Sequence, residues 1–118
     1  MPAHIYTRVG RYRDAVIANQ KAVAADDAYL AACRPGVAVY PLAYVPHNHH
    51  FLWATTTMEG RSADALAAAR QTARHVDHSL MREPQMAMLQ HFSAIPYYAL
   101  VRFGMWDEIL VEPAPDAD

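Results

Sequence analysis

The chain has little cysteine, lysine or glycine, and it has no long apolar run. Cys33 is the single cysteine, so an intrachain disulfide is impossible, and a lone cysteine is most often a small buried apolar residue. Lys21 is the only lysine, and the arginines are spread along the chain, which leaves no basic tract for nucleic acid. No apolar stretch approaches the roughly 18–20 residues that cross a membrane, and the N-terminal residues lack the apolar core of a signal peptide. We therefore expect no nucleic acid and no membrane partner, and a cytoplasmic location by default.

The chain also lacks the signatures of common enzyme classes. It has no HExxH zinc motif, no glycine-rich loop for phosphate, and no nucleophile with a neighbouring base. An enzyme is therefore the less favoured class of function. What is abundant is apolar, since 53% of the 118 residues are hydrophobic, 19% are charged and the formal net charge is −2. This composition suits one small domain with a packed core.

Apolar residues recur at helical spacing, and the helix-breaking residues fall between the periodic segments. Ser62 is the expected N-cap of one helix, and Pro96 should kink or split another. The only short strand candidate, residues 37–40, is followed at once by Pro41. The prediction is therefore an all-α fold. Helices are expected over residues 13–26, 46–58, 62–77 and 84–103.

Three glycines stand at matching places in this pattern. Each follows a predicted helix, and an acidic residue and a small or apolar residue come four and five positions later: G-R-Y-R-D-A from Gly10, G-R-S-A-D-A from Gly60 and G-M-W-D-E-I from Gly104. The pattern resembles the tetratricopeptide repeat (TPR), a helix–turn–helix unit. The resemblance implies one domain, a TPR-like superhelix (solenoid) of antiparallel helix pairs, with degenerate repeats at about 1–27, 46–78 and 84–110. A generic antiparallel helix bundle is the alternative.

The chain departs from the family pattern in several ways. Asp27 stands where a closing proline is usual, and Ser62 replaces the turn tyrosine of the second unit. The glycines are separated by 50 and 44 residues, more than the roughly 34 of the family. Extended connections are therefore expected between the units, at residues 28–45 and around 79–88.

Both ends of the chain resemble the interior of a larger bacterial TPR-like protein. Solenoid ends need a polar cap, because each unit buries its apolar face only against a neighbour. The resemblance therefore implies a fragment, or a homo-oligomer that forms through uncapped ends. The apolar residues expected to be covered by another copy are Ile5, Val9, Leu100 and Ile109.

In TPR-like solenoids the first helix of each pair lines a concave groove, at fixed offsets before the turn glycine. These offsets follow one stripe of an α-helix. Counting back from the three glycines places four of the seven histidines on this stripe. Arg8 and Arg102 would hold an acidic side chain or a C-terminal carboxylate. The predicted ligand groove consists of His4, Arg8, His47, His50, Met58, His91, Tyr98 and Arg102.

The histidines raise a second possibility, because His47 and His50 belong to the dense cluster P-H-N-H-H. They are i, i+3 on one helix, whereas His49 points towards the partner helix. Imidazoles in this arrangement suit zinc, copper or nickel, so His4, His47, His50 and His91 are also candidate metal ligands. No carboxylate or cysteine joins them, which weighs against a metal.

The predicted function is accordingly a TPR-like interaction module that binds a peptide or protein partner in a histidine-lined groove. The alternative is a metal-binding domain, or part of a metal-dependent enzyme. His75 and His78 end a predicted helix, where imidazoles interact favourably with the helix dipole. Trp53, Tyr97 and Trp106 are expected in core and turn packing.

Overall fold

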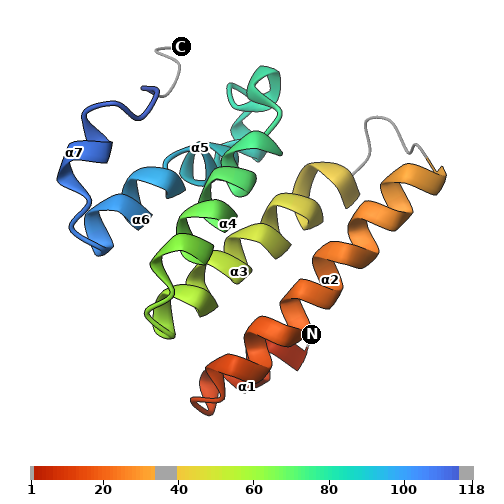
Figure 1. Cartoon of the computed structure of the whole chain (residues 1–118). Coiled ribbons are helices and arrows are strands. Elements are labelled where there is room, and N and C mark those ends of the chain that lie inside the picture. The colour runs from red at the N-terminus through yellow and green to blue at the C-terminus, as the bar shows by residue number, and fades with distance from the viewer. Residues whose placement is uncertain (1, 34–39, 115–118) are drawn as a thin grey trace.

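The computed structural model describes residues 2–33 and 40–114, and every regular element in these ranges is helical (Figure 1). The all-α prediction is confirmed for this part of the chain. None of the described helices is long and apolar enough to cross a membrane. The α-helices are α1 (Pro2–Arg8), α2 (Tyr12–Cys33), α3 (Val45–Met58), α4 (Ser62–Arg74), α5 (Met88–Ser93), α6 (Ile95–Arg102) and α7 (Trp106–Ile109). A π-helical turn covers Tyr40–Tyr44, and short 3-10 turns cover His78–Leu80 and Pro84–Met86.

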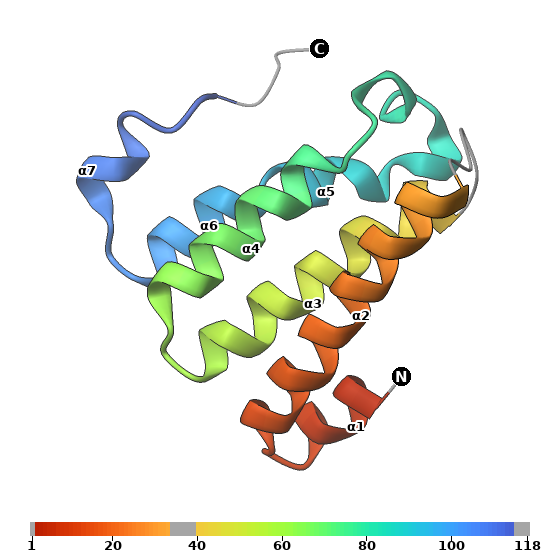
Figure 2. The same cartoon turned by 45° about the vertical axis from the view of Figure 1, so that its right-hand side comes forward.

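Helices that are neighbours in sequence are largely neighbours in space. α1 packs on α2, α2 on α3, α3 on α4, α4 on α6, and α6 on α7. Figure 1 and Figure 2 show α2, α3 and α4 side by side with alternating chain direction, while α6 lies beyond α4. α5 runs beneath the end of α4 and contacts both α4 and α6. Contacts between successive helices therefore hold the fold together.

Gly10, Gly60 and Gly104 join their helices with one backbone geometry. Their φ angles are +76°, +72° and +66°, a left-handed region in which only glycine carries no steric penalty. In each turn the glycine N–H donates to the carbonyl three residues back, and the next N–H donates to the carbonyl five residues back. At Gly60 these two bonds measure 3.0 and 3.1 Å. This pair of bonds is the Schellman motif, so the expectation of three equivalent inter-helix turns is confirmed.

The residues that follow the glycines explain how the next helices begin. Arg11 pairs with Asp14 at 2.7 Å, and Arg61 pairs with Asp64 at 2.8 Å, both in exposed positions where an ion pair adds little stability. Arg61, rather than Ser62, is the N-cap of α4, and no side chain caps this helix end. The predicted serine cap is therefore wrong, because the turn leaves a single residue between the glycine and the helix.

Small side chains form the buried face of α4. Its buried residues are Ala65, Ala68, Ala69 and Thr72, which let the backbone of α4 come close to its neighbours. Around them lie two apolar clusters. The first consists of Ala69, Ile95 and Ala99, with Trp53 and Leu66 packed against it. The second consists of Val76, Leu89 and Phe92, with Leu80, Met81 and Met86 packed against it.

The structure corrects several helix boundaries and burial expectations. α2 continues to Cys33, beyond its predicted end at residue 26, and Cys33 is exposed rather than buried. Most of the strand candidate lies outside the described residues, and Tyr40 belongs to the π-helical turn. The alanine-rich sequence that follows Asp26 is compatible with helix, so it prolongs α2 instead of forming a loop.

Pro96 divides the last predicted helix, as expected. α5 ends at Ser93 and α6 begins at Ile95, with Ala94 between them, and Pro96 stands in the first turn of α6. A proline is tolerated there because the N–H that it lacks has no partner within the helix. The remainder of the predicted helix, 84–87, is a 3-10 turn and the residue that follows it.

The residues expected to be covered by another copy have mixed exposure. Ile5 and Val9 are 65% and 62% exposed, whereas Ile109 is half-buried. Leu100 is fully buried in the core, so its assignment to an uncovered end is wrong. Trp106, expected in core or turn packing, is 62% exposed, because α7 has a single turn and covers little of the ring.

Candidate functional site

A buried polar network sets how α3 lies against α2. The side-chain amide of Asn48 donates to one oxygen of the Asp26 carboxylate at 2.8 Å, and the Tyr40 hydroxyl donates to the other at 2.6 Å. The Asn19 amide donates to the backbone carbonyl of Asn48 at 3.3 Å. Asp26, Asn48 and Asn19 are at most 4% exposed, and buried polar groups are costly when unpaired. The network therefore fixes the rotation of α3.

This rotation decides where the histidines of α3 point. Asn48 and His49 are buried, so His47 and His50 lie on the opposite face of the helix. His49 stacks on His75, the residue that follows α4, with ring centroids 4.7 Å apart. The expectation that His49 points towards the partner helix is confirmed.

His4, His47, His50 and His91 form two ring pairs that meet on one face of α3, and we call these four residues the histidine row. His4 on α1 stacks with His47, and His50 meets His91 of α5 edge-on, with ring centroids 5.5 Å apart in each pair. His47 and His50 are neighbours on one face of α3. Beyond His91 the row continues to Tyr98 of α6, at 5.8 Å. Four helices therefore contribute rings to one surface.

Aromatic side chains surround the histidine row. Phe51 stacks on His4 at 4.0 Å between centroids, and Trp53 and Phe92 each lie 5.2 Å from the His50 ring. Within residues 2–33 and 40–114, no carboxylate forms a hydrogen bond or an ion pair with the histidine row. The surroundings of these imidazoles are therefore apolar, and they disfavour a charged ring.

The pKa values follow from this environment. Burial, and to a smaller extent the neighbouring charges of His91 and His47, lower the pKa of His50 to about 4. Burial also lowers the pKa of His47, and burial followed by the charge of His47 lowers the pKa of His4. At neutral pH these three imidazoles are therefore uncharged. A neutral imidazole offers one hydrogen-bond donor and one acceptor.

The other predicted site residues flank the row. Arg8 is exposed on α1, near enough that its charge contributes to the lowered pKa of His4. Tyr98 is 49% exposed, and Arg102 is exposed one turn further along α6. Met58 is 52% exposed, but it lies about two turns from His50 at the end of α3. Met58 therefore belongs to the edge of the site rather than to its centre.

Several buried polar atoms near the row have no hydrogen-bond partner among the described residues. They are Nδ1 of His4, Nε1 of Trp53 and Oγ1 of Thr57. Buried polar groups in proteins are almost always paired, so such atoms are uncommon. The protein itself covers these atoms, so a bound molecule could pair with them only after neighbouring side chains move.

The histidine row does not assemble a metal site. Within residues 2–33 and 40–114, no three His, Cys, Asp or Glu side chains are arranged to hold one ion. His4 and His47 are nearly parallel, with 17° between ring planes, so their ring edges lie alongside one another instead of converging. A stable zinc site needs three or four protein ligands around one point. The geometry therefore does not favour His4, His47, His50 and His91 as a zinc, copper or nickel set.

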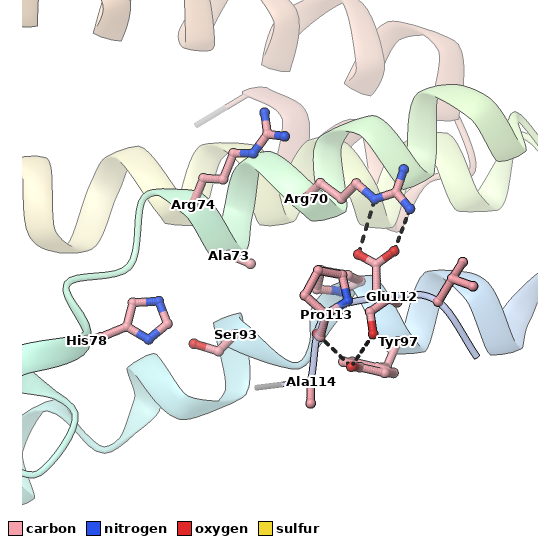
Figure 3. Close-up of a pocket in the computed structure, with 11 residues that line it drawn as sticks. Arg70, Ala73, Arg74, His78, Ser93, Tyr97, Glu112, Pro113 and Ala114 are labelled. Carbon is pink, nitrogen blue, oxygen red and sulfur yellow. Dashed lines mark hydrogen bonds and ion pairs between the residues drawn. The ribbon is translucent and has the colours of Figure 1, made fainter. Parts of the chain in front are cut away.

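A second site, which sequence reasoning did not find, lies between α4, α6 and the segment after α7. A cavity of about 510 Å³ opens there (Figure 3). Tyr97, expected in packing, lines this cavity, while the adjacent Tyr98 contacts the histidine row. Residues far apart in the sequence form the cavity, and no motif brings them together. The only sequence signal was the proline-containing stretch E-P-A-P, which cannot continue α7.

The chain was compared with protein families, curated proteins and solved structures. No protein-family model, no curated protein and no solved structure matches the chain. What the chain binds must therefore be inferred from its own residues.

Proposed function

We propose that this chain is a TPR-like interaction module that binds a peptide or protein segment along the histidine row. The observation that carries the proposal is the row itself, in which rings from α1, α3 and α5 lie side by side and continue to Tyr98 of α6. A core needs no such series of partly exposed, uncharged imidazoles, whereas a binding surface uses them well. The three matching glycine turns support the TPR-like arrangement, in which the first helices of each pair share one side.

The chemistry of the row suits a peptide. Uncharged imidazoles can donate to backbone carbonyls and accept from backbone N–H groups, so they match the alternating polarity of a main chain. The aromatic rings around His4 and His50 favour apolar side chains of the ligand. Arg8 and Arg102, at opposite ends of the row, suit a carboxylate of an acidic residue or of a C-terminus. We therefore expect a ligand with an apolar centre and an acidic end.

Selection of peptides against the immobilised protein tests the proposal. A random peptide library would be displayed on phage, and the affinity of the selected peptides would be measured by fluorescence anisotropy. His50→Ala and Arg102→Ala should each weaken binding by about tenfold, the loss typical of one good polar contact. Arg13→Ala removes an exposed arginine of α2 outside the row and serves as the matched control. Circular dichroism should show unchanged helicity in all three variants.

Two results would contradict the proposal. One is that the selected peptides bind His50→Ala and Arg102→Ala as tightly as they bind the wild type. The other is stoichiometric zinc, copper or nickel in protein purified without an affinity tag, if that metal is lost in His47→Ala. The second result would favour the metal-binding alternative.

A further inference from the structure

The segment after α7 crosses back over α4 and α6 as a strap, which we define as residues 110–114. Glu112 reaches down to Arg70 of α4, and both of its carboxylate oxygens accept from the guanidinium, the Nε bond measuring 3.2 Å (Figure 3). The Glu112 side chain is only 9% exposed. A two-pronged arginine–carboxylate pair of this kind is specific in geometry as well as in charge.

A second contact holds the backbone of the strap. The hydroxyl of Tyr97 donates to the carbonyl of Pro113 at 2.7 Å, and more weakly to the carbonyl of Glu112 at 3.4 Å. Arg70 and Tyr97 come from different helices, so together they recognise an acidic side chain and the proline carbonyl that follows it. Figure 3 shows both side chains directed at the strap.

Apolar contacts contribute little to this attachment. Leu110 and Val111, the large apolar residues of the strap, are 83% and 81% exposed. The strap therefore stays in place through a few polar contacts, which another carboxylate can replace one for one.

The surface beyond the strap is hollow. The cavity of about 510 Å³ continues past Pro113 and is lined there by Ala73, His78 and Ser93. Figure 3 shows these side chains around the space next to the strap. Arg74 also lines the cavity, one helical turn after Arg70, and forms no ion pair with the described residues. A longer ligand could therefore make apolar, hydroxyl and cationic contacts that the strap does not use.

We propose that the α4–α6 surface is a second recognition site, which binds an extended acidic peptide segment with a proline after the acidic residue, supplied by a partner protein. The chain's own Glu112 and Pro113 occupy this site as an internal competitor. The seated strap shows how such a segment lies, and the charge of Arg70 with that of Arg74 selects for acidic residues. The site lies on the Tyr97 side of α6 and does not include the histidine row.

The test uses the strap sequence itself as the probe. Acetylated and amidated L-V-E-P-A would be titrated into ¹⁵N-labelled protein, and the shifts of the Arg70 and Tyr97 signals would be followed. Glu112→Ala removes the internal competitor, so the peptide should bind this variant about tenfold more tightly than the wild type. The control peptide L-V-Q-P-A, without the carboxylate, should bind neither protein. Glu112→Ala/Arg70→Met should lose binding, and Glu112→Ala/Arg13→Ala should retain it.

Three outcomes would overturn the proposal. They are the absence of shifts in Glu112→Ala at millimolar peptide, equal shifts with the glutamine peptide, and equal affinity of the wild type and Glu112→Ala. If Glu112→Ala does not fold, the same titration of the wild type tests the proposal. Excess L-V-E-P-A should displace the strap and shift the signals of residues 110–114. A wild-type dimer that dissociates in Arg70→Met would make a second copy the occupant and would overturn the assignment to a separate partner.

Discussion

Mild acid should destabilise the fold through His50. In the folded chain burial, together with the neighbouring charges of His91 and His47, lowers the pKa of His50 to about 4, against an ordinary value of 6.5. As the pH falls, His50 therefore becomes protonated near pH 6.5 in the unfolded chain but only near pH 4 in the folded chain. The stabilisation that neutral His50 provides is complete above pH 6.5, and it is lost as the pH falls from 6.5 towards 4.

The size of the effect follows from the difference in pKa. Between pH 7 and pH 5 a shift of this size corresponds to about 2 kcal/mol of unfolding free energy for His50 alone. Part of the ring remains in contact with solvent, which screens the effect and leaves about 1–2 kcal/mol. His4, His47 and His49 also have lowered pKa values, so the whole protein should lose more than this amount.

Urea unfolding followed by circular dichroism at pH 7 and pH 5 measures the loss. The variant His50→Phe keeps an aromatic ring beside Trp53 and Phe92 but cannot bind a proton. Its stability should therefore fall less between the two pH values than that of the wild type, by about 1–2 kcal/mol. The control Leu110→Ala changes an exposed side chain outside the row that binds no proton, and it should keep the wild-type pH dependence.

The comparison has a clear negative outcome. If His50→Phe loses as much stability as the wild type between pH 7 and pH 5, then a lowered pKa of His50 is not the cause of the loss of stability in acid. The apolar environment assigned to the histidine row would then be wrong. A wild-type stability that does not change over this range would contradict the argument for the other three histidines as well.

Two further predictions concern the parts of the fold that position the row. Asp26→Asn places an amide where the Asn48 amide now donates, so we expect the free energy of unfolding in urea to fall by about 1–3 kcal/mol. The hydrogen bond to Asp26 is the largest cause of the raised pKa of Tyr40. In the variant, ultraviolet titration should therefore show the pKa of Tyr40 moving back towards its ordinary value. An unchanged tyrosine titration would argue against that hydrogen bond. Gly60→Ala meets no atom within 4 Å, so its cost should come from the positive φ alone, about 1–2 kcal/mol in thermal unfolding, and a neutral substitution would show that the turn can relax.

Local sequence signals predicted the helices and their turns well. The glycines at 10, 60 and 104 form Schellman turns, and Pro96 starts a new helix, because both residues act through their own backbone dihedral angles. Helical spacing also predicted that His47 and His50 share a face while His49 turns inward. These features depend on a few neighbouring residues, which is why sequence reasoning reached them.

Features that depend on distant residues were missed. The Asp26–Asn48 hydrogen bond and the Arg70–Glu112 pair join residues that are 22 and 42 positions apart. A signal for the polar network around Asn48 existed in Asn19, which lies on the apolar stripe of α2 where a polar residue needs a buried partner. The sequence contains no signal for the Arg70–Glu112 pair, because the position of Glu112 depends on the path of the chain after α7.

The alanine face of α4 restricts how the protein can adapt to a ligand at either of the proposed sites. Alanine has no rotamers to exchange, so the contacts of Ala65, Ala68 and Ala69 with neighbouring helices cannot repack when something binds. Induced fit must therefore come from elsewhere, through rotation of the imidazole rings or release of the strap. A variant such as Ala69→Leu would enforce larger helix separation and deform both proposed binding surfaces at once. The middle of the molecule thus acts as a rigid frame between two adjustable surfaces.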